Sequence, residues 1–230
     1  MKEQIPLRIR PADDAAFTNF FGPRNRDTAD RLERWCQEGG PGAIVLCGDR
    51  GTGKSHLLQA CCQLAREQGE AAVMVSLNEL RQVGPEALLG LEHYTMIGVD
   101  DLDEVAGAPQ WEEAVFGLYN RMVDHRLRLV IALSQTPAHT GFVLPDLVSR
   151  LQQGLLLKLR SYRDEDRVPI FCARAAQRGL TMSEDVAAYI LRRAPRGMDD
   201  LVNVLDQLDQ KSLVTGRKLT IPFVKSVMEW

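Results

Sequence analysis

The chain has 230 residues, of which 45% are hydrophobic and 26% charged, and its formal net charge at pH 7 is −3. This length and composition are typical of a soluble globular protein with one large domain and one small domain. The negative balance disfavours sequence-independent DNA binding, because no global basic field attracts the phosphate backbone. No stretch approaches the roughly 18 apolar residues of a membrane span, and the N-terminus has no apolar signal segment. We therefore predict a cytoplasmic protein without membrane contact.

The cysteine pattern argues against disulfides and against a zinc site. No C-x-x-C pair occurs, and four of the five cysteines fall in apolar helix or strand patterns, as buried thiols do. The five are Cys36, Cys47, Cys61, Cys62 and Cys172.

The first residues form a segment that is expected to be extended. Pro6 disfavours a helix there, so Leu7 and Ile9 face one side, three and five residues after Gln4. Such an apolar tail either packs on its own domain or serves as a docking peptide for a partner. A helix is predicted next, over residues 25 to 37, where Asn25 and Asp27 are both suitable N-caps.

A phosphate-binding loop is the strongest signal in the chain. Residues Gly48–Ser55 match the pattern G-x-x-x-x-G-K-[ST] at every required position. The apolar strand Ala43–Cys47 precedes the loop, and a helix that ends at Gly69 follows it. A strand, loop and helix in this order predict a site for a polyphosphate.

The residue types of the loop explain this chemistry. Gly48, Gly51 and Gly53 let the backbone approach an anion closely, and the following helix directs its positive dipole end at the same point. Lys54 would reach the outer phosphates, and the hydroxyl of Ser55 would ligate Mg²⁺.

Two further apolar strands are predicted over residues 71–77 and 94–99, and the second runs directly into Asp100 and Asp101. In an open α/β sheet, ligands lie at the carboxyl ends of the strands, beside the phosphate loop. Asp100 is therefore expected in the Mg²⁺ shell, and Asp101 could orient a water for attack on a γ-phosphate. The alternative is an acidic turn that caps the next helix.

The rest of the large domain continues the alternation of helices and strands. A helix is predicted over 110–126, and a strand over 127–133 ends at Ser134 and Gln135, which either approach a γ-phosphate or form a polar turn. A short helix over 145–150 and a strand over 155–159 complete the pattern. The fold class is therefore α/β, with a five-stranded, mostly parallel sheet.

From Asp164 onward only helical patterns remain, and they predict a small all-helical lid domain. The expected helices run to Gln177, with a start or a kink near Pro169, then from Thr181 with Glu184 as a capping-box partner, then over about 199–215. A last helix is expected at Pro222. The predicted divisions are an extended tail over 1–15, a nucleotide-binding α/β domain over 16–162 and the lid over 163–230.

These features together resemble an AAA+ ATPase, and several sequence words narrow the resemblance. Gly53–Leu58, and Leu147–Leu151 with Gly154, resemble the DnaA-related AAA+ family. The chain ends at Trp230, after the lid, so the DNA-binding domain of DnaA is not expected. Over nearly its whole length the chain is similar to the Hda family of DnaA regulatory inactivators, through the words at 111–121, 205–209 and 217–225.

The resemblance implies roles for individual residues, with ADP or ATP and Mg²⁺ as cofactors. Arg150 matches the arginine finger that completes the site on DnaA; the alternative is a surface arginine paired with Asp146. Where the family places the sensor-2 arginine, this chain has Asp199, and Arg196 would have to substitute. The residues implied in nucleotide contact are Gly48, Gly51, Thr52, Gly53, Lys54, Ser55, His56, Ser134 and Arg196, with Ser55 and Asp100 at the metal.

The function that the resemblance implies is regulatory inactivation of the replication initiator DnaA. In that family the tail, here Gln4, Ile5, Leu7 and Ile9, binds the β sliding clamp of DNA polymerase III, so that DNA is reached through the clamp. The ADP-bound protein then stimulates hydrolysis of the ATP on DnaA, and its own ATPase activity is expected to be weak or absent. The alternatives are a self-sufficient ATPase such as a helicase loader and a nucleotide-sensing adaptor without a role in hydrolysis. Self-association is left open.

Overall fold

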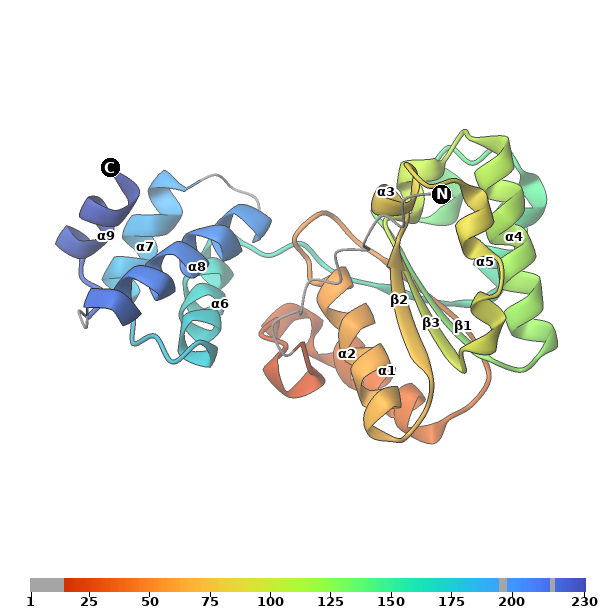
Figure 1. The fold of residues 1–230 in the computed structure, drawn as a ribbon, viewed down its shortest axis with the longest axis horizontal. Helices are drawn as coiled ribbons and strands as arrows, with labels where there is room; N and C mark the ends of the chain where they lie inside the picture. The colour runs from red at the N-terminus through yellow and green to blue at the C-terminus, as the bar shows by residue number, and fades with distance from the viewer. Residues whose placement is uncertain (1–14, 195–197, 216–217) are drawn as a thin grey trace, which may run out of the picture.

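A computed structural model describes residues 15–194, 198–215 and 218–230. The chain folds into an α/β unit that an extended segment connects to a bundle of helices (Figure 1). The tail residues Gln4, Ile5, Leu7 and Ile9 and the lid residue Arg196 lie outside the described residues.

The α/β unit contains a five-stranded sheet in which all neighbouring strands are parallel, in the order β2-β3-β4-β1-β5. This arrangement confirms the predicted fold class, and it places the carboxyl ends of β3, β4 and β1 side by side. The strands are β1 (Gly42–Cys47), β2 (Ala72–Ser76), β3 (Met96–Asp100), β4 (Arg128–Leu133) and β5 (Leu155–Lys158).

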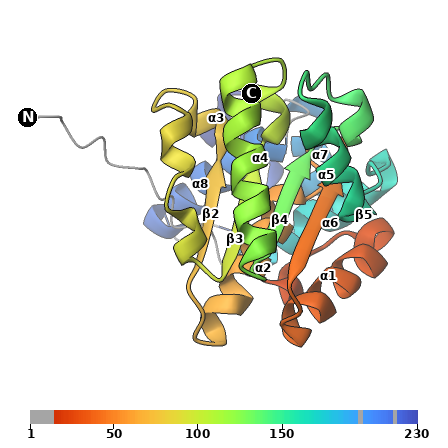
Figure 2. The same cartoon turned by 90° about the vertical axis from the view of Figure 1, so that its right-hand side faces the viewer.

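Helices cover both faces of the sheet (Figures 1 and 2). Side chains of a strand alternate between the faces, so Ile44 and Leu46 of β1 pack with α1 (Arg26–Glu38) and α2 (Lys54–Glu67). Val45 and Cys47 point to the other face, where α3 (Leu77–Leu80), α4 (Pro109–Asp124) and α5 (Pro145–Gln153) lie. Burial on both faces explains why the strands are apolar throughout.

The lid is built from α6 (Asp164–Gln177), α7 (Glu184–Arg193), α8 (Met198–Thr215) and α9 (Ile221–Met228). These helices share a core of their own, which includes Phe171, Ile190, Leu205 and Val224. In the part of the chain that the structure describes, no helix is both long and apolar enough to cross a membrane.

Three boundaries differ from the sequence prediction. The second lid helix begins at Glu184 rather than Thr181, because Ser183 is its N-cap and its side chain accepts a hydrogen bond from the backbone N–H of Val186 at 3.5 Å. Helix α5 continues to Gln153, three residues beyond its predicted end at Arg150, so Arg150 lies within its last turn. Helix α6 begins five residues before Pro169, which lies inside it.

Candidate functional site

The loop between β1 and α2 has the backbone conformation that its glycines predict. Gly51 (φ 79°) and Gly53 (φ 99°) are in the left-handed region, which side chains other than glycine rarely adopt. At Gly53 a Cβ atom would also lie only 2.6 Å from the ring of Phe20. The Thr52 hydroxyl donates a hydrogen bond to the Asp49 carbonyl at 2.8 Å and closes the turn. The loop therefore leads directly into the N-terminus of α2, the kind of position at which anions bind.

Lys54 is held against this loop. Its side chain is almost fully buried, and Nζ donates hydrogen bonds to the carbonyl oxygens of Gly48 (2.6 Å) and Asp49 (3.1 Å). Burial lowers the pKa of Lys54, while the carboxylates of Asp100 and Asp103 act in the opposite direction. The ammonium group thus lies inside the loop, at the position from which a lysine contacts phosphate oxygens.

The two predicted metal ligands, Ser55 and Asp100, are neighbours at the start of α2 and the end of β3. The hydroxyl of Ser55 lies near enough to the carboxylate of Asp100 to lower its pKa, and Asp100 is 4% exposed at the end of β3. Burial raises the pKa of Asp100, whereas Ser55, the N–H of Asp101 (3.0 Å) and Lys54 lower it. Hard oxygen ligands at one point beside a phosphate loop suit Mg²⁺.

The protein alone offers only part of a metal shell. Among the residues with described positions, no group of three or more histidine, cysteine, aspartate or glutamate side chains could hold a metal ion. Mg²⁺ in nucleotide sites usually keeps one or two protein ligands and takes its other oxygens from phosphate and water. Ser55 and Asp100 therefore fit a nucleotide-dependent magnesium site.

Asp101 and Asp103 point to different neighbours. Asp101 adopts a left-handed backbone conformation (φ 55°), and its carboxylate accepts a hydrogen bond from the hydroxyl of Ser76 at 3.2 Å. Asp103 instead accepts a hydrogen bond from the backbone N–H of Ser134 at 2.9 Å. The predicted site residue Ser134 is therefore hydrogen-bonded to Asp103, in the turn that follows β3. The sequence pattern did not distinguish Asp103 from the other acidic residues of this turn.

His56 contacts the segment that precedes α1. Its Nε2 lies 3.1 Å from the carbonyl oxygen of Ala16, and its ring centroid is 5.6 Å from that of Phe20. Burial is the main cause that lowers the pKa of His56. Because Phe20 also touches Gly53, His56 supports the loop through this aromatic contact.

A hollow of about 320 Å³ lies beside Phe20 and is bordered on its other side by Pro169 and Ile170 of α6. Residues of the α/β unit and of the lid both line this hollow, next to the phosphate loop. The hydroxyl of Tyr162, in the connecting segment, donates a hydrogen bond to the carbonyl of Thr52 at 3.0 Å and joins the two parts further. An aromatic and aliphatic hollow next to a phosphate site suits the base of a nucleotide.

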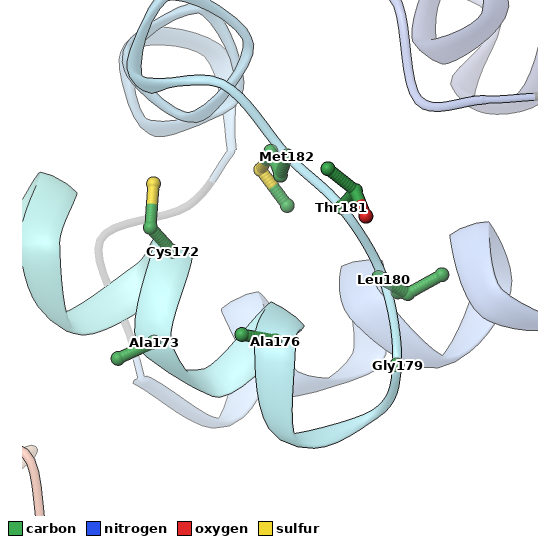
Figure 3. A pocket seen from close by; sticks show the side chains of 7 residues that line it. All are labelled: Cys172, Ala173, Ala176, Gly179, Leu180, Thr181 and Met182. Atoms are coloured by element: carbon green, nitrogen blue, oxygen red, sulfur yellow. The ribbon is translucent and has the colours of Figure 1, made fainter.

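A larger hollow of about 470 Å³ lies within the lid, between α6 and the loop that follows it (Figure 3). Its lining carries no charged side chain and includes Cys172, Gly179 and Met182. The residues that carry the phosphate chemistry are all elsewhere, so the smaller hollow beside Phe20 is the one that belongs to the candidate site.

Arg150 is separate from the loop. Its Nη1 donates a hydrogen bond to the side-chain oxygen of Gln153 at 3.3 Å. The expected alternative, an ion pair with Asp146, is not formed between these two described residues. The cationic end of Arg150 is therefore held near the end of α5 by a neutral side chain.

Comparison with known proteins agrees with this fold. A family model described as "Hda, lid domain" matches residues 164–228, the four helices of the lid. Domain III of the replication initiation protein DnaA from Thermotoga maritima is similar in structure, with a TM-score of 0.77 and 21% identity over 94% of this chain and 96% of that one.

Two other solved structures define the breadth of the similarity. AMPPCP-bound DnaA from Aquifex aeolicus has a TM-score of 0.69 and 21% identity, over 88% of this chain and 66% of that one. The Holliday junction branch migration motor RuvB from Thermotoga maritima has a TM-score of 0.65 and 18% identity, over 94% of this chain and 72% of that one. The α/β unit with its helical lid thus shares the fold of DnaA and RuvB, and residues 164–228 match the lid domain of Hda.

Proposed function

We propose that this protein binds ADP or ATP with Mg²⁺ and regulates DnaA by contributing Arg150 to the nucleotide site of DnaA, where it stimulates ATP hydrolysis. The observation that carries the proposal is the position of Arg150 in the last turn of α5, which ends beside the start of β1 rather than beside the phosphate loop. An arginine that lies away from its own loop is available to complete the site of a neighbour.

The distance follows from the packing of α5 against the sheet. Gly154, directly after α5, approaches the start of β1 so closely that a Cβ atom there would lie 3.0 Å from the carbonyl oxygen of Ala43. The loop begins five residues later, at Gly48, about 16 Å along the strand. Arg150 lies four helical residues before Gly154, which recovers about 6 Å of this separation. Arg150 therefore remains roughly 10 Å from the loop along the strand direction.

The side chain suits a role in trans. A guanidinium group is permanently charged and forms paired hydrogen bonds with phosphate oxygens, so it stabilises the charge that spreads over a γ-phosphate during hydrolysis. Arginine fingers supply about 10³- to 10⁵-fold in rate in characterised systems. Arg150 is partly exposed in the last turn of α5, where a partner can approach it.

The charges around the loop favour a diphosphate over a triphosphate as the resting ligand. Four carboxylates, those of Asp100, Asp103, Asp101 and Asp49, act on Lys54. A bound magnesium ion would neutralise part of the phosphate charge. The additional negative charge of a γ-phosphate would still be repelled by these carboxylates. This repulsion supports an ADP-bound regulator with weak or absent hydrolysis of its own.

The second proposed binding partner, the β sliding clamp, rests on the resemblance of the N-terminal tail to the clamp-binding tail of the Hda family. Gln4, Leu7 and Ile9 would bind a groove on the β sliding clamp as an extended peptide. The clamp would then bring the protein to DNA and to DnaA, so that DNA is reached only indirectly. With a net charge of −3, the chain carries no global basic field that would replace the clamp.

The test is the amount of ADP formed from ATP-bound DnaA in the presence of clamp-loaded DNA. Wild-type protein should stimulate hydrolysis, whereas Arg150→Ala should lower the stimulated rate at least about 10³-fold. Arg150→Lys should not restore it, because an ammonium group cannot reproduce the forked donation of guanidinium. Arg31→Ala, an exposed arginine on the opposite face of the sheet, is the matched control and should keep full activity.

The same assay separates the alternatives. Full activity of Arg150→Ala would refute a role in trans. An adaptor would leave the nucleotide of DnaA unchanged in every reaction. A helicase loader would hydrolyse ATP by itself when helicase or single-stranded DNA is added.

A further inference from the structure

Glu112, in the first turn of α4, is a fully buried carboxylate at the base of α5. Its exposed fraction is 0%. The described part of the chain contains no ion pair that involves Glu112. Removing an ionised carboxylate from water is costly unless hydrogen bonds replace the lost hydration. The site must therefore supply those hydrogen bonds by other means.

Backbone N–H groups supply them. Oε1 of Glu112 accepts from the N–H of Gly107 at 2.7 Å and of Val143 at 3.1 Å. Oε2 accepts from the N–H of Val143 at 2.9 Å and of Leu144 at 2.7 Å. Both oxygens thus face donors only, which suits a carboxylate and leaves no place for the NH₂ group of an amide.

The surroundings add the field of two helix termini. Glu112 lies in the first turn of α4, and the N–H groups of Val143 and Leu144 immediately precede α5, whose N-cap is Leu144. Both helices begin with proline at their first position, Pro109 and Pro145, so they carry no N–H group there. The positive ends of both helix dipoles therefore point at one buried carboxylate. Figure 2 shows these two helices next to each other on one face of the sheet.

This arrangement determines where α5 starts. The carbonyl of Leu144 accepts the first helical hydrogen bond, from Val148 at 3.3 Å, so the helix grows directly from the residue that Glu112 holds. Leu147 and Leu151 anchor the same helix in the core. Arg150 lies six residues after Leu144, about 9 Å along the helix axis. A small tilt at Leu144 is therefore transmitted to the end of the Arg150 side chain.

We propose that Glu112 is a positioning residue for Arg150: it fixes the start of α5 and thereby the place from which Arg150 acts on a partner's nucleotide. This inference rests on the proposed function, since it concerns the same arginine. It predicts a loss of the maximal rate without a loss of binding. A displacement of about 1 Å at a reacting group can cost about 100-fold in rate.

The experiment compares Glu112→Gln with Glu113→Gln. The two residues are adjacent, and Glu113 is exposed, so the control makes the same chemical change outside the buried site between α4 and α5. In the assay with ATP-bound DnaA and clamp-loaded DNA, Glu112→Gln should lower the maximal stimulated rate about 10- to 100-fold. The concentration of protein at half-maximal rate and the affinity for ADP should stay the same.

These readouts separate positioning from general damage. A partly unfolded population would raise the concentration needed for half-maximal rate but would still reach the full maximal rate. Glu112→Asp keeps the charge between the two helix termini, so its maximal rate should be closer to wild type than that of Glu112→Gln. This second variant also provides the measurement if Glu112→Gln fails to fold.

An independent readout needs no DnaA. Amide hydrogen exchange at Val143 and Leu144 should be at least about 10-fold faster in Glu112→Gln, because hydrogen bonds to a charged acceptor are lost. If exchange accelerates while the maximal rate equals that of Glu113→Gln, or if Glu112→Asp is less active than Glu112→Gln, the inference is wrong. If wild-type protein itself does not stimulate hydrolysis by DnaA, the proposed function is wrong, and no variant is needed to show it.

Discussion

The side chain of Asn25 pairs with the backbone of Arg160, 135 residues further along the chain. Oδ1 accepts a hydrogen bond from the N–H of Arg160 at 2.7 Å, and Nδ2 donates one to its carbonyl at 3.0 Å. Asn25 is at the N-cap position of α1, but its side chain makes no capping hydrogen bond there. The N-cap position agrees with the sequence pattern, whereas the long-range partner decides what the amide does. This pair joins the segment before α1 to the chain that leads from β5 to the lid.

Asn25→Ala should therefore lower the free energy of unfolding by about 2 to 3 kcal/mol, because Asn25 is 1% exposed and two backbone groups lose their partner. Chemical denaturation in urea measures the difference. The control is Asp27→Ala, which removes the other residue suited to cap α1. Asp27 is exposed in the first turn of α1, so this change should cost less than about 1 kcal/mol. Equal losses in the free energy of unfolding for the two variants would show that the hydrogen bonds to Arg160 add no stability beyond that of an ordinary surface contact.

Lys54→Ala should weaken ADP binding about 10- to 100-fold, because a charge-assisted hydrogen bond to phosphate contributes roughly 1.5 to 3 kcal/mol. Isothermal titration calorimetry measures the affinity directly. Lys218→Ala, at an exposed lysine in the lid, should bind ADP like wild type. An unchanged affinity in Lys54→Ala would remove the loop from the candidate site.

Deletion of residues 1–10 should abolish binding to the β sliding clamp and leave the thermal unfolding of the protein unchanged. The expected cause is the loss of the apolar anchors Leu7 and Ile9, since buried anchors of this kind contribute about 2 kcal/mol or more each. Surface plasmon resonance on immobilised clamp gives the affinities. In an extended peptide Arg8 faces away from Leu7 and Ile9, so Arg8→Ala is the control and should bind nearly as well as wild type. Undiminished clamp binding after the deletion would mean that the tail is no docking peptide.

Protonation of His56 should destabilise the fold at acidic pH. Burial lowers the pKa of His56 below its ordinary value of 6.5, although the hydrogen bond to Ala16 opposes this effect. Below pH 6.5 the unfolded state therefore binds a proton that the folded state does not. The free energy of unfolding is highest above pH 6.5, and it falls as the pH drops toward the folded-state pKa of His56. Urea denaturation from about pH 5 to about pH 8 measures this slope.

His56→Gln should flatten the dependence on pH over this range, and His125→Gln, at an exposed histidine after α4, should keep it. The same slope in wild type and His56→Gln would assign the dependence to another group.

The local features of this protein could be read from the sequence because they depend on residues close together in the chain. The loop is one example: Gly51 and Gly53 are needed for left-handed backbone, Lys54 opens a helix, and an apolar strand precedes them. The alternation of apolar strands and helices likewise predicted a parallel sheet, since strands buried on both faces carry apolar side chains throughout. The proximity of Ser55 to Asp100 follows once β1 and β3 belong to one sheet.

The tertiary structure decided which of several similar residues acts, because spacing does not specify contacts between distant segments. Asp101 and Asp103 belong to the same acidic turn, but only the neighbouring position of β4 brings Ser134 to Asp103. Glu112 and Glu113 are adjacent glutamates in one helix, and the direction in which α4 packs buries the first and exposes the second. Arg150 is far from the loop because α5 runs back along the sheet to the start of β1. Hydrogen bonds that span more than a hundred residues, such as Asn25 to Arg160, form only when the whole sheet has been assembled.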